Sequence, residues 1–270
     1  MTRWTHLLAL AVLLAAGCAG PSERFARVAE RHGLVSRTVT GDGFDHVVFA
    51  RQDAPAGGPL HLYLEGDGTP YTGRRPAIDP TPRRPVILNL LARDPARAVL
   101  LGRPCYHGMV SQPGCTTALW TDGRYGEAVV HSLAAAARRL LTASGADELV
   151  LIGHSGGGTL AMLLAERLGA TVAVVTIAGN LDVGAWTTHH GLPPLAASLD
   201  PAGRPPLPPA IHQLHLAGDR DRVVPPAMIA TALDATGGPD VKVLPGFGHA
   251  CCWHRIWPEL LHELHAPAQN

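Results

Sequence analysis

The chain has 270 residues, which suffices for one large domain and is short for two. Hydrophobic residues make up 46% of it, so the chain can bury a sizeable core. The 22 basic and 22 acidic side chains balance, and no long run of one sign occurs. This pattern argues against a nucleic-acid-binding protein and against a polybasic membrane surface.

The 15 histidines are scattered without the spacing of metal ligands. His189 and His190 are the only adjacent pair, and neighbours in sequence seldom face one ligand. A solvated loop pair is therefore the preferred interpretation, with a metal site as the alternative. We predict no metal and no cofactor.

Residues 1–18 are typical of an export signal. Arg3 supplies a positive start, and residues 7–16 form an apolar run that is too short for a membrane span of ~20 residues. The run ends in Leu14-Ala15-Ala16-Gly17-Cys18, which resembles a bacterial lipobox, although Ala15 stands where that motif usually has Leu. The resemblance implies a lipid on Cys18 and a periplasm-facing, membrane-anchored position in the cell envelope. An ordinary cleaved signal and a secreted protein are the alternative.

Export into an oxidising compartment favours disulfides among the remaining cysteines. Cys105 and Cys115 lie ten residues apart in a Gly/Pro-rich stretch, and we predict that they pair. Closing so short a loop stabilises a fold by about 3 kcal/mol in the chain-entropy treatment. The adjacent Cys251 and Cys252 form either a vicinal bridge or two separate contacts, and the sequence leaves both open.

Apolar runs of strand length alternate with helical patterns along most of the chain. Strands are predicted at residues 39–49 (interrupted by a Gly41-Asp42-Gly43 turn), 60–64, 98–102, 149–152, 172–177, 211–216 and 241–244. Helices are predicted at residues 125–141, 159–168, 226–235 and 257–265. Near-continuous Val/Ile/Leu strands that alternate with helices are typical of a mostly parallel sheet covered on both faces, so the predicted fold class is α/β.

The expected organisation is a signal at 1–18, a linker at 19–35 and a single domain at 36–270. Residues 70–85 have the composition of a loop. Residues 180–210 form a second, proline-rich loop between two strands, which is longer than an ordinary connection and is predicted to be a lid or an active-site wall. Its Trp186, Leu192 and Leu195 either line an apolar pocket or only pack on the surface.

A candidate nucleophile follows the strand predicted at 149–152. Gly153-His154-Ser155-Gly156-Gly157 has a glycine two residues before and two after a serine, which is the pattern of a sharp strand-to-helix turn with an exposed hydroxyl. The glycines are needed because side chains at those positions would collide with neighbouring backbone. The predicted helix that follows places N–H groups beside Ser155.

Two partners for Ser155 follow later strands. A serine hydroxyl needs a base within hydrogen-bond reach, usually a histidine that a carboxylate orients. His249 follows the strand at 241–244 in a Gly-Phe-Gly-His loop, and Asp221 follows the strand at 211–216. Because parallel strands end at one edge of a sheet, the three side chains are expected to meet there. Asp219 is the rival acid, and the rivals of His249 as base are His254 and His215.

From about Val39 to the C-terminus the chain resembles the α/β-hydrolase superfamily, in which the triad has the order Ser, Asp, His. The segments at 79–82 and 103–106 are similar to exported lipoprotein members of that superfamily. The resemblance implies an oxyanion hole made by the N–H groups of Gly156 and Asp67. The superfamily usually has His-Gly at the second of these loops, where this chain has Glu65-Gly66.

The leading hypothesis is a serine hydrolase that cleaves a carboxylic ester or thioester of a small molecule or lipid through an acyl-serine intermediate. A peptidase or an acyltransferase that uses the same triad is the second hypothesis. A non-catalytic envelope binding protein on a hydrolase scaffold is the third, since fold alone does not prove function.

Overall fold

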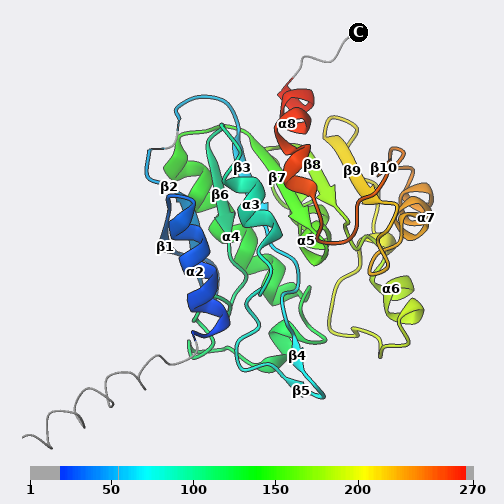
Figure 1. The fold of residues 1–270 in the computed structure, drawn as a ribbon, viewed down its shortest axis with the longest axis horizontal. Coiled ribbons are helices and arrows are strands. Elements are labelled where there is room, and N and C mark those ends of the chain that lie inside the picture. Colours follow the sequence, from blue (N-terminus) through cyan, green and yellow to red (C-terminus); the bar gives the residue numbers. More distant parts are fainter. Residues whose placement is uncertain (1–18, 54, 266–270) are drawn as a thin grey trace, which may run out of the picture.

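The computed structural model describes residues 19–53 and 55–265. Their centre is an eight-stranded sheet with the strand order β1-β2-β6-β3-β7-β8-β9-β10 (Figure 1). β1 and β2 pair antiparallel, β2 and β6 pair antiparallel, and every other neighbouring pair is parallel. The strands are β1 (Leu34–Thr40), β2 (Asp45–Arg51), β3 (Leu60–Leu64), β6 (Ala98–Leu101), β7 (Leu149–His154), β8 (Thr171–Ile177), β9 (His212–Gly218) and β10 (Lys242–Leu244). A separate small hairpin consists of β4 (Tyr71–Thr72) and β5 (Arg75–Pro76).

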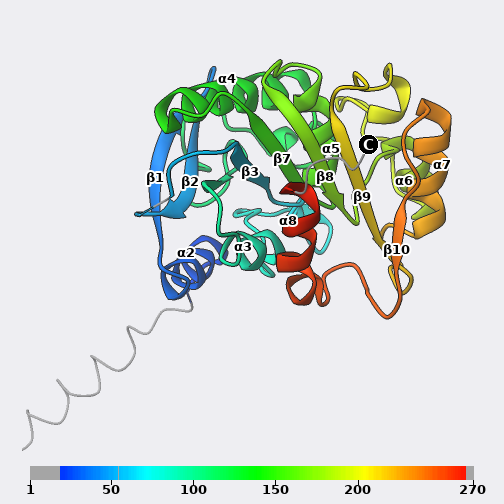
Figure 2. The same cartoon turned by 90° about the horizontal axis from the view of Figure 1, so that it is seen from above.

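Helices cover both faces of the sheet, which Figure 2 shows as two layers. The bounds are α2 (Pro21–Arg31), α3 (Val86–Leu91), α4 (Glu127–Ser144), α5 (Gly156–Ala165), α6 (Val183–His189), α7 (Pro226–Thr236) and α8 (Trp257–His265), with short 3₁₀ turns at Thr117–Trp120, Pro201–Gly203 and Trp253–Arg255. α4 and α5 pack on one face, whereas α2, α3 and α8 pack on the other. α7 lies beside β9 near the β10 edge.

The alternation of side chains explains why the strands are apolar throughout. On β3, Leu62 and Leu64 face the α4–α5 layer, while Tyr63 between them faces the α3–α8 layer. β7 repeats the pattern, with Leu151 in the first core and Ile152 in the second. A strand buried on both faces has no polar side to expose, so it is a continuous hydrophobic run.

Three segments differ from the sequence-based expectation. Residues 19–35 were expected to be a linker, but they contain α2 and the start of β1, because Phe25 and Ala29 lie one helical turn apart and are both buried. α3 was not predicted, since six mostly apolar residues are too few to display a helical period. The 180–210 segment contains the short helix α6.

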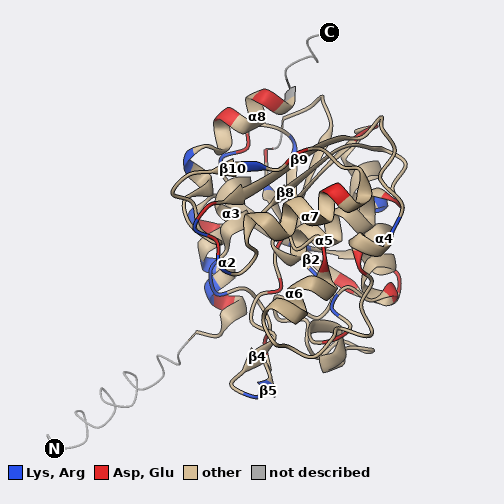
Figure 3. Ribbon diagram, turned by 90° about the vertical axis from the view of Figure 1, so that its right-hand side faces the viewer, with Lys and Arg blue, Asp and Glu red and all other residues tan. Residues whose placement is uncertain are grey.

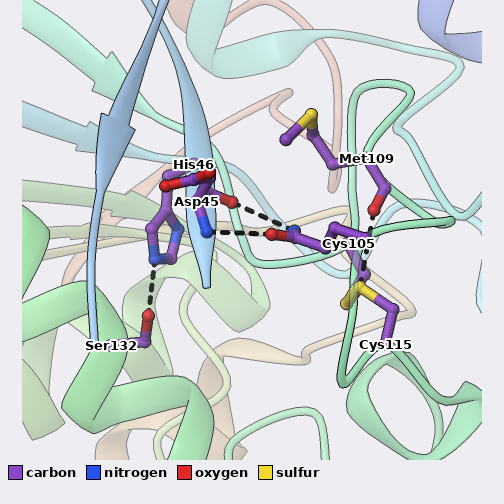
Figure 4. The surroundings of a disulfide bond; sticks show 7 residues. Asp45, His46, Cys105, Met109, Cys115 and Ser132 are labelled. Carbon is purple, nitrogen blue, oxygen red and sulfur yellow. Dashed lines mark hydrogen bonds between the residues drawn. A yellow bond between two sulfur atoms is a disulfide. The ribbon is translucent and has the colours of Figure 1, made fainter. Parts of the chain in front are cut away.

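A disulfide staples the loop that follows β6 (Figure 4). Cys105 and Cys115 are joined, with their Cα atoms 5.8 Å apart, as the spacing predicted. In the same loop the Gln112 side-chain amide accepts from the Asp45 N–H at 2.9 Å and donates to the Asp45 carbonyl oxygen at 3.1 Å. The loop is therefore held against the start of β2.

The positions of charged residues are dispersed over the helices and loops, as Figure 3 shows. No helix within residues 19–53 and 55–265 combines the length and the apolar character needed to cross a bilayer.

Candidate active site

Ser155 stands between the end of β7 and the start of α5 and has φ 55° and ψ −123°. A positive φ is uncommon for a residue other than glycine and persists only where surrounding contacts hold it. The Ser155 N–H donates to the Ile177 carbonyl oxygen at 2.9 Å, and the Ser155 carbonyl oxygen accepts from Gly158 at 2.9 Å and Asn180 at 3.2 Å. These bonds fix the sharp turn that raises the hydroxyl above the sheet edge.

The two flanking glycines are required by close backbone contacts. A Cβ on Gly153 would lie 2.1 Å from the Gly157 carbonyl oxygen, and a Cβ on Gly157 would lie 2.1 Å from the Leu64 carbonyl oxygen. Because the clashing atoms are backbone, they cannot turn away as a flexible side chain would. The structure thus gives the steric reason that the glycine spacing suggested. α5 begins at Gly156, three residues before the predicted start.

The three predicted side chains meet at the sheet edge. His249 Nε2 lies 3.0 Å from Ser155 Oγ, and His249 Nδ1 lies 2.8 Å from Asp221 Oδ2. Asp221 follows β9 and His249 follows β10, so each residue of the set leaves the carboxyl end of a different parallel strand. In this order the imidazole can accept the hydroxyl proton, and the carboxylate can orient the imidazole and stabilise its charged form.

Asp221 is held as an ionised carboxylate. Its Oδ1 accepts from the Val223 N–H at 2.7 Å and the Val224 N–H at 2.9 Å, while Oδ2 accepts from His249. Burial by itself raises the pKa of Asp221, but the His249 bond and the two N–H groups outweigh it and lower the pKa below its usual value. The carboxylate is therefore available to orient and stabilise an imidazolium.

The rival residues have other partners. Asp219 Oδ1 accepts from the Gly246 N–H at 2.7 Å, so this carboxylate shapes the loop that leads to the base. His215 is buried within β9 and bonds Thr176 Oγ1 at 2.8 Å. His254 lines the cleft in the turn after the base without a hydrogen bond to the nucleophile.

Two side chains that the sequence did not single out hydrogen-bond the main chain of His249, the candidate base. His154 Nε2 donates to the His249 carbonyl oxygen at 2.7 Å, and Trp253 Nε1 donates to the same oxygen at 3.1 Å. Burial and the adjacent His249 imidazole lower the pKa of His154 to about 3, so His154 is a neutral donor. The only signal for His154 in the sequence is its place inside the nucleophile motif.

The loop after β3 passes beside the nucleophile. A Cβ on Gly66 would lie 3.2 Å from Ser155 Cβ, and a Cβ on Gly156 would lie 2.0 Å from Asp67 Oδ1. The Gly156 N–H is the first of α5, so the helix offers it no carbonyl acceptor. The two residues whose N–H groups were expected to form an oxyanion hole therefore pack against each other.

A buried cage holds the Asp67 carboxylate. Arg103 Nη2 and Arg124 Nη1 each donate at 2.9 Å, and the Tyr125 hydroxyl donates at 2.7 Å. The Tyr106 hydroxyl donates to the Asp67 carbonyl oxygen at 2.9 Å, so the main chain is held as well. Burial alone raises the pKa of Asp67, but Arg124, Arg103 and Tyr125 outweigh it and lower the pKa, which leaves an ionised carboxylate bound to two cations.

Glu65 precedes this loop and is 3% exposed. Burial raises the pKa of Glu65 to about 8, against the lowering effect of the N–H groups of Leu88 and Gly66 and of the Arg103 charge. Its Oε1 has no hydrogen-bond partner. Glu65 is therefore a mostly uncharged acid at neutral pH.

The site opens into a cleft of about 910 Å³. Ser155 and His249 lie in its lining together with the loop at 65–70, residues 82–86 and the turn after the base. Of the three apolar residues of the 180–210 segment, Trp186 lines the cleft, Leu192 is 46% exposed and Leu195 packs against the α4–α5 core.

A second disulfide lies in the turn after the base. Cys251 is joined to Cys252, which resolves the alternatives left by the sequence in favour of a vicinal bridge. Cys251 lines the cleft two residues after His249, and Trp253 directly follows the bridge.

The remaining predicted positions are placed as follows. Within the described parts of the chain no group of His, Cys, Asp and Glu side chains is arranged to hold a metal ion. His190 Nε2 lies 2.8 Å from the Val223 carbonyl oxygen, and its neighbour His189 packs against it edge to face. Cys18 and the rest of the proposed signal lie outside the described residues.

Comparison with known proteins identifies the fold. No family model matches the chain, and no curated protein matches its sequence. A solved structure titled as a membrane phospholipase A is 19% identical, with 98% of this chain and 97% of that chain covered and a TM-score of 0.60. A hormone-sensitive lipase from a metagenome library is 17% identical over 96% of this chain and 97% of that chain, with a TM-score of 0.58. An α/β serine hydrolase without a lid, from Xanthomonas campestris, is 17% identical over 86% of this chain and 91% of that chain, with a TM-score of 0.54. The predicted α/β-hydrolase fold is confirmed.

Proposed function

We propose that this chain is a serine hydrolase that cleaves a carboxylic ester or thioester through an acyl-serine intermediate. The observation that carries the proposal is the chain of two hydrogen bonds from Ser155 Oγ through His249 to Asp221. The nucleophile turn supports it, because a positive φ at Ser155 is held where a hydroxyl is presented to the cleft.

In the first half-reaction Ser155 Oγ attacks the carbonyl carbon of the ester. A new C–O bond forms, the hydroxyl proton passes to His249 Nε2, and the carbonyl electron pair moves onto oxygen. We assign the N–H groups of Gly156 and Asp67 to this oxyanion, where each such donor contributes roughly 3–4 kcal/mol to transition-state stabilisation. The bond to the leaving oxygen or sulfur then breaks, and His249 gives that atom the proton.

In the second half-reaction water releases the acyl group. The oxygen of a water molecule attacks the acyl carbon, and His249 Nε2 accepts a proton from that water. The bond between the acyl carbon and Ser155 Oγ then breaks, and His249 returns the proton to Oγ. One water is consumed, and an acid and an alcohol or thiol are released. Asp221 stays ionised throughout and stabilises the imidazolium.

A fluorophosphonate probe tests the proposal directly. Wild-type protein is expected to be labelled stoichiometrically, and the Ser155→Ala variant, which removes only the hydroxyl, is expected to remain unlabelled. Esters and thioesters with acyl chains of graded length then measure turnover. A folded wild-type protein that neither reacts with the probe nor turns over any acyl substrate would refute the enzyme and favour a binding protein.

We also propose that the chain is exported and carries a lipid on Cys18 at the cell envelope, as its lipobox-like segment suggests. Growth with a labelled fatty acid is expected to label wild-type protein but not a Cys18→Ala variant. Labelling of neither, together with release of soluble protein, would favour an ordinary secretory signal.

A further inference from the structure

The segment that follows the loop after β3 is strongly basic, and its two ends line the cleft. Residues 69–85, here called the cationic wall, contain four arginines and one acidic residue, Asp79. The arginines are Arg74, Arg75, Arg83 and Arg84. All four are exposed, and none forms an ion pair with another described residue. Arg83 and Arg84 also line the cleft.

Carboxylates offset only part of this charge: the single Asp79 stands against the four arginines of the wall, which leaves it a net charge of +3. Asp67 is bound by two arginines, and Asp79 accepts from the Ser22 N–H at 2.9 Å, the Ser22 hydroxyl at 2.7 Å and the Thr81 N–H at 3.0 Å. Glu65 is buried and mostly uncharged at neutral pH. The chain as a whole is neutral, so this excess is local.

The same wall exposes apolar side chains. Ile78 is 89% exposed, the most among the large hydrophobic residues described, and Tyr71 is 46% exposed. Arginines flanking exposed apolar and aromatic side chains are typical of surfaces that lie at the membrane interface, where apolar groups enter the lipid and cations meet anionic headgroups.

The wall is held firmly although its only regular structure is the β4–β5 hairpin. The Thr69 N–H donates to the Pro80 carbonyl oxygen, and the Ala77 N–H donates to the Pro70 carbonyl oxygen, both at 2.9 Å. Asp79 ties the wall to α2 through Ser22. These bonds close the main chain of the segment on itself and join it to α2.

The wall and the beginning of the described chain share one end of the molecule. Figures 1 and 3 show the β4–β5 hairpin and the start of α2 at the lower end in both views, with α8 at the upper end. The described chain begins at Ala19, three residues before the Ser22 that bonds Asp79. The first described residue therefore lies close in sequence to the α2 residue that bonds the cationic wall.

We propose that the cationic wall docks on an anionic lipid bilayer, with Ile78 and Tyr71 in the interface, and that the cleft takes its acyl ester from a lipid of that surface. The inference rests on the proposed hydrolase function. It adds the class of substrate and the orientation of the protein on the bilayer. Hydrolysis of such a lipid consumes one water and releases a fatty acid and a lipid alcohol.

The test uses the full chain with vesicles of phosphatidylcholine alone or mixed with phosphatidylglycerol. Wild-type protein is expected to bind the anionic vesicles more tightly and to release fatty acid from them faster. The Arg74→Gln/Arg75→Gln variant is expected to lose at least about tenfold of that affinity, since each arginine near an anionic surface contributes roughly fivefold. Circular dichroism and the thermal midpoint verify that the variant is folded.

A matched control removes the same charge elsewhere. Arg31 and Arg37 are exposed on α2 and on the edge strand β1, away from the cleft. The Arg31→Gln/Arg37→Gln variant is expected to keep wild-type binding. An equal loss in both double variants would mean that net charge alone drives binding, and would overturn the proposed docking surface.

The orientation has its own readout. Ile78→Trp is expected to give tryptophan fluorescence that brominated acyl chains in anionic vesicles quench, relative to wild type. Val35→Trp, at a position 43% exposed on β1, is expected to show no added quenching. Equal quenching at both positions would overturn the orientation.

Failure of this inference is distinguishable from failure of the hydrolase function. Turnover of short soluble esters with no preference for anionic over zwitterionic vesicles would overturn the docking proposal and leave the enzyme intact. Arginine-dependent preference for soluble anionic esters, without vesicle binding, would assign the arginines to substrate charge and would also overturn it. Absence of turnover and of fluorophosphonate labelling would remove the function itself.

Discussion

The imidazole of His154 and the main-chain carbonyl of His249 are joined by a hydrogen bond of 2.7 Å. The residue next to Ser155 thus holds the loop that carries His249, and Trp253 Nε1 donates to the same carbonyl oxygen. The nucleophile turn and the base loop are therefore positioned relative to each other by more than the Ser155–His249 contact.

Replacing His154 by Phe removes this donor, whereas Gln keeps an N–H on a side chain of similar reach. A neutral hydrogen bond contributes about 1 kcal/mol, so His154→Phe is expected to lower kcat roughly five- to tenfold with little change in KM. Because the pKa of His154 is about 3, the acid limb of the pH–rate profile above pH 5 is expected to stay unchanged. Steady-state kinetics check both points, and wild-type kcat in His154→Phe would show that the bond does not position the base.

The two aspartates of the turn after β9 provide a matched pair. Asp221→Asn removes the charge that holds His249 and is expected to lower kcat by up to about 10⁴-fold. Asp219→Asn removes a charge but keeps a side-chain oxygen that can accept from the Gly246 N–H, and is expected to change kcat a few fold at most. Parallel kinetics of the two variants decide the matter, since an equal loss in Asp219→Asn would return the acid assignment to that residue.

Asp67→Asn would leave two buried guanidinium groups without their counter-charge. Removing one partner of a buried ion pair destabilises a fold by about 3–5 kcal/mol, so a clear drop in the denaturant midpoint is expected. The rate of fluorophosphonate labelling is expected to fall as well, because the main-chain N–H of the same residue is assigned to the oxyanion. Tyr125→Phe removes a neutral donor from the same cage and is expected to have a smaller effect on both measurements. Unchanged stability and labelling in Asp67→Asn would contradict the cage.

Glu65 links stability to pH. Its pKa in the fold is about 8, against 4.5 for the free side chain, so the folded state holds a proton that the unfolded state releases. The contribution of Glu65 to the free energy of unfolding is therefore most favourable below about pH 4.5 and declines as the pH rises to about 8. The free energy of unfolding of Glu65→Gln is expected to rise by a few kcal/mol relative to that of wild type as the pH increases across this window, since one pKa unit corresponds to about 1.4 kcal/mol. Urea unfolding of both proteins at pH 5, 7 and 9 measures the difference, and a pH-independent difference would show that the acid is ionised in the fold.

Much of the fold is predictable because its strands are buried on both faces. β3 begins and ends where the apolar run Leu60–Leu64 does, and β8 and β10 lie within one residue of their predicted bounds. The meeting of Ser155, Asp221 and His249 follows from the same fact, since residues that come after parallel strands share one sheet edge. Local spacing and sheet geometry suffice for these predictions.

The surroundings of the site were not predictable in the same way. Arg103 and Arg124 lie 36 and 57 residues from the Asp67 that they bind, and no local pattern connects them. α2 was missed because its polar surface outweighs Phe25 and Ala29 in the sequence. The cationic wall was likewise not predicted: its arginines occur as two separate pairs in a segment with the composition of a loop, which folds into the β4–β5 hairpin and is tied to α2 through Asp79 and Ser22.

Within the described part of the chain every cysteine sulfur is paired, and the Cys251–Cys252 bridge is the pair that borders the cleft. A thiol small enough to approach the acyl group also meets Cys251, two residues from the proton-accepting imidazole. Exchange with that thiol would open the ring, leaving a mixed disulfide on one cysteine and a free thiol on the other. The bridge therefore closes the main chain between His249 and Trp253, whose indole donates to the His249 carbonyl oxygen.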